Sequence, residues 1–171
     1  MVSFIPKEIY ASICDLTPQV LRRMGVKLLM MDFDNTIVPY TEDIPAPEVL
    51  DWLRSVQEAG VSLCVVSNTK RQRAPEFCRK YGIDCITHAK KPFPRGIREA
   101  LRRYDADPCE AALVGDQIYT DILGANGCGV RSVLIQPLHL HNIWLRMRHW
   151  AELPWIAAGR RCACGSSGKN Q

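Results

Sequence analysis

Two aspartates, Asp32 and Asp34, stand one residue apart directly after the apolar run at 26–31. That run is too short to cross a membrane and is typical of a buried strand in a parallel sheet. Because side chains alternate along an extended chain, Phe33 points away and both carboxylates face one side. Each acid raises the cost of ionising the other, and a divalent cation removes that cost. A carboxylate beside a hard cation is suited to attack on phosphorus, although Asp-Asn-Thr is also a turn-forming sequence.

Two groups suited to binding phosphate follow in chain order. Ser67 and Asn68 end the next apolar run, where a hydroxyl and the backbone N–H groups after it can hold phosphoryl oxygens without adding charge. An ordinary turn or helix cap has the same sequence. Lys91, fixed by the proline after it, supplies a point charge for a phosphoryl group and for an attacking carboxylate. Taken alone, Lys91 also fits a solvated basic loop.

A second acidic pair, Asp116 and Asp121, follows a later apolar run and Gly115. The glycine lets the backbone approach a ligand closely. Asp116 is placed to complete the near-octahedral oxygen shell that Mg²⁺ demands. Asp121 either orients a water of that shell, braces Lys91, or serves only the dipole of the helix that it begins.

The apolar spacing predicts alternating strands and helices that position these groups. The expected strands after the first run are 61–66, 84–87, 111–114 and 131–135, and the expected helices are 47–59, 71–81, 96–104 and 119–125. Such alternation predicts an α/β fold, a Rossmann-like three-layer sandwich with a central parallel sheet. Ligand sites of such sheets lie at the carboxyl ends of the strands, so the four groups are expected to meet there.

Composition sets the outer limits of this interpretation. A chain of 171 residues suits one domain with a full core and a short tail. The net charge of +4 is mild, and we expect no nucleic-acid partner. We expect a cytoplasmic protein, because no window is apolar enough to span a bilayer, no signal peptide is evident, and six of the eight cysteines are dispersed as reduced thiols would be.

The polar groups together form an ordered set that covers residues 26–136. The set is Asp32-x-Asp34-x-Thr36, Ser67-Asn68, Lys91-Pro92 and Gly115-Asp116-x-x-x-x-Asp121. It resembles the four motifs of the haloacid dehalogenase superfamily of phosphohydrolases. The residues within these motifs are most similar to those of the YqeG-like branch of subclass IIIA, which is related to mitochondrial phosphatidylglycerophosphate phosphatases.

The resemblance implies the catalytic roles. Asp32 is expected to be the nucleophile that forms an aspartyl-phosphate. Asp34 is expected to protonate the leaving oxygen and then to activate water. Ser67 and Lys91 are expected to bind the phosphoryl group, with Asn68 beside them.

The resemblance also implies a Mg²⁺ cofactor. Asp32, the main chain of Asp34, and Asp116 are expected to hold the ion, and Asp121 to support its shell. The expected substrate is a phosphomonoester, with phosphatidylglycerophosphate as one candidate and a soluble sugar phosphate or nucleotide as the alternative.

Receiver domains of signalling systems are the rival from another class, since they also combine clustered acids, a phosphorylated aspartate and a Lys-Pro. Their phospho-acceptor lies mid-chain and their lysine late. Here the second acidic pair follows the lysine, and that order disfavours a receiver. A phosphatase-like scaffold without activity is disfavoured by the full set of charged residues.

We expect the sequence to divide into an N-terminal extension at 1–25, the core at 26–138, a basic amphipathic helix at 139–158 and a disordered tail at 159–171. The gaps in which this superfamily carries caps are short, so no cap domain is expected. The helix carries Trp144 and Trp150 among arginines, a pattern typical of peripheral membrane contact, here at the inner face. Packing on the core or on another subunit is the alternative. Cys162 and Cys164 could be half of a metal site, although two sulfurs at this spacing are a weak signal. Whether they bind metal is open, as is the oligomeric state.

Overall fold

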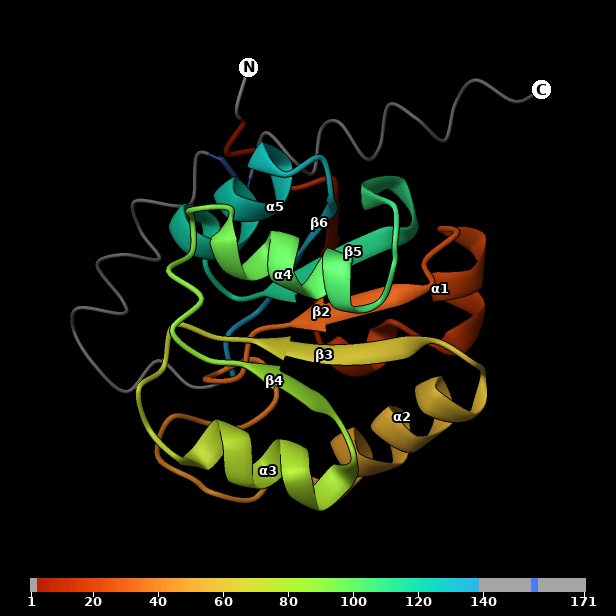
Figure 1. Ribbon diagram of the computed structural model, residues 1–171. Helices are drawn as coiled ribbons and strands as arrows, with labels where there is room; N and C mark the ends of the chain where they lie inside the picture. The colour runs from red at the N-terminus through yellow and green to blue at the C-terminus, as the bar shows by residue number, and fades with distance from the viewer. Residues whose placement is uncertain (1–2, 139–154, 157–171) are drawn as a thin grey trace.

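A six-stranded, fully parallel sheet forms the centre of the computed structural model, which describes residues 3–138 and 155–156. The strand order is β1-β6-β5-β2-β3-β4, with helices on both faces (Figure 1). The strands are β1 Glu8–Tyr10, β2 Leu28–Met31, β3 Ser62–Val66, β4 Asp84–Ile86, β5 Ala111–Gly115 and β6 Arg131–Ile135. The α-helices are α1 Pro18–Arg23, α2 Pro47–Glu58, α3 Arg73–Tyr81, α4 Arg95–Arg103 and α5 Leu123–Gly127. The predicted three-layer α/β fold is confirmed.

Strand β2 lies at the centre of the sheet and shows how the two faces are covered. Leu29 and Met31 belong to the apolar cluster that includes α2 and α3, whereas Leu28 and Met30 belong to the cluster that includes α4. All four side chains are buried. A strand buried on both sides has an unbroken apolar sequence rather than an alternating one, which is why this run was recognisable.

The helix expected at 119–125 begins instead with a π-helical turn, Ile118–Ile122, that leads into α5. The carbonyl of Gln117 accepts hydrogen bonds from the N–H groups of both Asp121, at 2.9 Å, and Ile122, at 3.3 Å. The second bond spans five residues and widens the turn. Such turns are frequent at functional sites, and this one carries Asp121.

The N-terminal segment expected as an extension is part of the sheet. Its strand β1 pairs in parallel with β6, with Glu8 opposite Val133. Leu16 and Leu21 of this segment are fully buried in the core. The Asn126 side chain donates to the carbonyl of Ser3, at 2.6 Å, and so ties the segment down further. A three-residue edge strand gives no apolar run, and the sequence therefore did not reveal it.

Of the predicted helix at 139–158, only Trp155 and Ile156 lie within the described residues. The Trp155 ring lies 5.2 Å from that of Phe4, and Ile156 packs against the small cluster formed by Ile118, Ile122 and Leu134. The rest of that helix, the tail at 159–171 and its two cysteines lie outside the described residues. No helix within the described part of the chain is long and apolar enough to cross a membrane.

Candidate active site

The polar groups predicted from the sequence meet at one edge of the sheet because the strand register brings their positions together. Met31 lies beside Val65 on one side and Val114 on the other. The next residue, Asp32, continues this register, and its N–H donates to the carbonyl of Val114 at 2.9 Å. The carboxyl ends of β2, β3 and β5 therefore present Asp32, Ser67 and Asp116 next to one another, at the place where such sheets bind ligands.

Three buried carboxylates form the centre of the site. One oxygen each from Asp32, Asp116 and Asp121 lies within 4.8 Å of the other two, and none of the three residues is more than 6% exposed. Hard oxygen donors gathered in this way are the ligands that Mg²⁺ prefers. The donor set therefore fits the expected ion. The Asp34 side chain lies outside this group, and metal binding by its main chain remains a prediction.

Lys91 neutralises part of this negative charge. Its ammonium lies 2.7 Å from Oδ1 of Asp32 and 2.7 Å from Oδ1 of Asp121. Burial disfavours the charge of Lys91, but the carboxylates of Asp121 and Asp32 outweigh burial and hold its pKa above the ordinary value. Burial raises the pKa of Asp121, although Lys91 opposes the rise. The sequence left three roles open for Asp121, and the ion pair with Lys91 matches one of them, that of bracing the lysine.

Asn68 fixes the backbone of Lys91 with both atoms of its side-chain amide. Its Nδ2 donates to the Lys91 carbonyl at 2.9 Å, and its Oδ1 accepts from the Lys91 N–H at 2.7 Å. The side chain of Asn68 thus positions the lysine, and its phosphate contact stays a prediction, for which its second Nδ2 hydrogen and its main chain remain. Ser67 is buried at the same strand end, where its Oγ accepts from the N–H of Thr69 at 3.2 Å.

Gly115 is required by the close approach of Asp121. A Cβ added to this glycine would lie 2.7 Å from the Asp121 Cβ and closer still to its carboxylate. The same carboxylate accepts a hydrogen bond from the Gln117 N–H at 3.1 Å. Asp121 therefore lies against the backbone of the strand end, which orients it toward Lys91.

Arg73 is the site residue that sequence reasoning missed. Its Nη1 lies 3.2 Å from Oδ1 of Asp34, and both side chains are largely buried. Burial raises the pKa of the Asp34 carboxyl, the charge of Asp32 adds to the rise, and Arg73 opposes it. The basic stretch at 70–73 looks like a solvated surface in the sequence, and no local signal marks its last member as buried.

The fold and the clustered acids together define a family. A model described as haloacid dehalogenase-like hydrolase matches residues 25–129, which is more than half of the chain. The chain belongs to this family, and the resemblance stated from its motifs is confirmed. Assignment to subclass IIIA remains a prediction.

Relatives from several organisms are phosphatases by name. Probable phosphatase YqeG of Bacillus subtilis is 31% identical over 135 residues, which are 79% of this chain and 78% of that protein. A glyceraldehyde 3-phosphate phosphatase of Pyrococcus abyssi is 31% identical over 111 residues, 59% of this chain and 45% of that protein. Phosphatidylglycerophosphate phosphatase 1 of Arabidopsis thaliana is 29% identical over 129 residues, 70% of this chain and 37% of that protein. The chain spans less than half the length of the last two. The prediction of a phosphatase of this family is confirmed.

Proposed function

We propose that the protein hydrolyses phosphomonoesters with the help of Mg²⁺ and through an aspartyl-phosphate on Asp32. The observation that carries this proposal is the burial of Asp32 between Lys91 and two further carboxylates, with Asp34 two residues away. A nucleophilic carboxylate forms a covalent intermediate and so divides one difficult step into two.

In the first step, an oxygen of Asp32 forms a bond to phosphorus while the bond from phosphorus to the leaving oxygen breaks. Asp34 gives its proton to that oxygen, so the leaving group departs as an alcohol and the phosphoryl group stays on Asp32. In the second step, Asp34 takes a proton from water, and the water oxygen displaces Asp32 from phosphorus. Inorganic phosphate and the free carboxylate of Asp32 result.

The remaining residues bind and orient the phosphoryl group. Lys91 would balance its charge and hold Asp32 in line, and the hydroxyl of Ser67, at the end of β3, would donate a hydrogen bond to a phosphoryl oxygen. When bound by Asp32, Asp116 and Asp121, Mg²⁺ would supply positive charge for the phosphoryl oxygens.

The test is to follow a ³²P-labelled aryl phosphate with wild-type protein, Asp32→Asn and Asp34→Asn. Asp32→Asn should neither turn over substrate nor retain label. Asp34→Asn should retain label as a phosphoenzyme and release it slowly, because a positioned acid or base contributes roughly 10²–10⁴-fold. Ordinary turnover by Asp32→Asn would rule out Asp32 as the nucleophile.

We further propose a lipid phosphate, with phosphatidylglycerophosphate as the specific candidate, as the substrate. Large apolar side chains are exposed on loops that leave the same edge of the sheet: Ile44 is 67% exposed and Phe93 is 68% exposed. Four cations on loops or helix starts at this edge are also exposed, namely Lys90 and Arg95 on either side of Phe93 in the sequence, and Lys70 and Arg71 after β3. Apolar and basic side chains together favour contact with an anionic bilayer.

The likeness to the plant enzyme supports the lipid, and the likeness to the archaeal one supports a soluble triose phosphate as the alternative. A panel of both substrates at equal concentration distinguishes them, with the lipid presented in anionic and in neutral vesicles. Co-sedimentation with the same vesicles, compared between wild-type protein and Phe93→Ser, tests whether the exposed apolar side chains contact the bilayer. A preference for the soluble ester, with no sedimentation of the wild-type protein, would exclude the lipid and peripheral contact at the inner face of the membrane.

A further inference from the structure

Arg73 contacts Asp34, two carbonyls of the loop after it, and Asp43, and it has no role in the reaction proposed above. Its guanidinium lies at the start of α3, and Nη1 contacts Oδ1 of Asp34 at 3.2 Å. Nη1 and Nη2 donate to the carbonyls of Tyr40 and Pro39, each at 3.1 Å. Nε forms an ion pair with Oδ1 of Asp43 at 2.7 Å. One side chain thereby holds Asp34 together with the loop that follows it.

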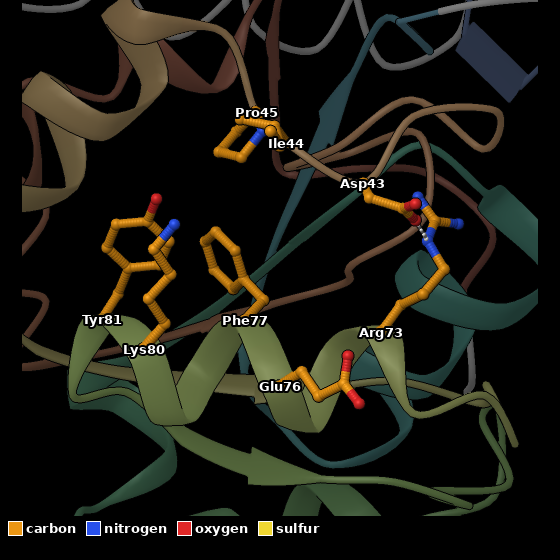
Figure 2. Close-up of a pocket in the computed structure, with 8 residues that line it drawn as sticks. All are labelled: Asp43, Ile44, Pro45, Arg73, Glu76, Phe77, Lys80 and Tyr81. Atoms are coloured by element: carbon orange, nitrogen blue, oxygen red, sulfur yellow. Dashed lines mark ion pairs between the residues drawn. The ribbon is translucent and has the colours of Figure 1, made fainter.

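The first part of that loop, residues 35–39, is buried, with Ile37 and Val38 in the apolar core, whereas its outer part, residues 40–44, is exposed. Residues 35–46 are all described and contain no helix or strand beyond one bridge between Asp34 and Val38. Behind the outer part of the loop lies a pocket of about 310 Å³ between it and α3. Figure 2 shows Ile44 and Pro45 across an open space from Phe77 and Tyr81, with Arg73 reaching Asp43 at one end. Because side chains do not fill the space behind this outer part, its contacts with Arg73 help to hold it in place.

We propose that Arg73 is a positioning residue for the leaving-group step, in which its guanidinium holds the Asp34 carboxylate and the loop at 39–43 in place. This inference rests on the proposed roles of Asp32 and Asp34. A guanidinium suits the task, because its planar fork reaches several acceptors at once, whereas an ammonium is a point charge. The guanidinium carbon also lies 5.7 Å from the centre of the Phe33 ring, between the two acids in sequence, which restricts its orientation.

A positioning role for Arg73 has a chemical consequence that a merely structural role lacks. No contact joins Arg73 to Asp32 or Lys91 among the described residues, so the attack on phosphorus keeps its own machinery. Proton transfer to the leaving oxygen depends on where Asp34 lies. A nitrophenolate leaves without a proton, whereas an alkoxide does not. Loss of Arg73 should therefore slow the hydrolysis of alkyl phosphates far more than that of nitrophenyl phosphate.

The experiment compares Arg73→Gln and Arg73→Lys with Arg79→Gln, which alters an exposed arginine on the same helix. For each, kcat and KM are measured with Mg²⁺ on p-nitrophenyl phosphate and on glycerol phosphate, and hydrogen exchange is measured over residues 35–46. Arg73→Gln should lose about 10–100-fold in kcat on glycerol phosphate, within the range a positioned acid contributes, and under about 3-fold on the aryl ester. Arg73→Lys should fall between, and Arg79→Gln should match the wild type.

Exchange in the loop should rise in Arg73→Gln and stay unchanged in Arg79→Gln. Equal losses of kcat on both esters would overturn the positioning role, whether or not the variant melts earlier. Wild-type protein that hydrolysed neither ester would instead contradict the proposed function. In that case the exchange data alone decide whether Arg73 holds the loop, and unchanged exchange would overturn the inference.

Discussion

Replacing Lys91 with methionine tests the electrostatic arrangement of the site directly. The ammonium lies 2.7 Å from one oxygen of Asp32 and 2.7 Å from one of Asp121, and both acids are buried. Methionine keeps most of the side-chain volume and removes the charge. Asp32, Asp116 and Asp121 then lie together without their nearest cation.

The cost follows from the geometry. Removing one partner of a buried ion pair costs about 3–5 kcal/mol, because the other charge stays buried without compensation. Lys91 contacts two carboxylates, but the loss of stability should stay near this range, since one of the two can take up a proton. Asp121 is the candidate, because burial already raises the pKa of its carboxyl. With a urea slope of about 2 kcal/mol per M, the unfolding midpoint should fall by about 1.5–2.5 M.

Urea unfolding followed by circular dichroism, in EDTA and again in Mg²⁺, measures this change. Lys90→Met is the matched control, because that lysine is the exposed neighbour of Lys91. The deficit of Lys91→Met should shrink in Mg²⁺, since a bound cation supplies part of the missing charge and stabilises the folded state. A midpoint in EDTA equal to that of the wild type would refute this account of the cluster.

Three further changes probe the parts around this cluster. Gly115→Ala should lower kcat by at least about 10-fold and stability by about 1–3 kcal/mol, because the new methyl group displaces Asp121; wild-type kinetics and thermal unfolding would contradict the close contact. Asn68→Ala should raise KM for phosphate esters but lower stability by only about 1–2 kcal/mol, since the site is exposed and water can replace the two hydrogen bonds to Lys91. An unchanged KM would contradict the role of Asn68 in positioning Lys91. EDTA should abolish turnover, Mg²⁺ should restore it, and Ca²⁺ should not, because Ca²⁺ takes more ligands at longer distances; full activity in EDTA would remove the metal from the mechanism.

The residues that the sequence brought together correctly share one property, which is that each follows a strand of the parallel sheet. Asp32, Ser67 and Asp116 come directly after β2, β3 and β5, and an apolar run announces each of these strands. Because parallel strands pair in regular register, their ends lie side by side, and this can be predicted without knowing any contact between distant residues. Lys91 is several residues past β4, and the Lys-Pro pattern rather than its position identified it.

The features that the sequence did not reveal depend on contacts between distant segments. Arg73 is buried only because the loop at 39–43 folds over it, and β1 is a strand only because β6 offers a free edge. The π-helical turn at Ile118–Ile122 differs from an ordinary helix start by one hydrogen bond that spans five residues. The spacing of apolar residues shows only which face of a segment is buried, so it does not reveal contacts between distant segments.

The two acids that stand one residue apart lie in different electrostatic environments, because different cations reach them. Asp32 meets Lys91, which comes from the loop after β4, whereas Asp34 meets Arg73, which comes from α3. The lysine is buried with its two carboxylates, so its contact holds Asp32 in a fixed orientation. Asp34 is more exposed, and burial and the charge of Asp32 raise its pKa while Arg73 opposes the rise. A nucleophile needs the first environment, and a group that must give and later take a proton needs the second. The proposed roles of Asp32 in attack and of Asp34 in proton transfer agree with these two environments, because a different element supplies the cation that reaches each acid.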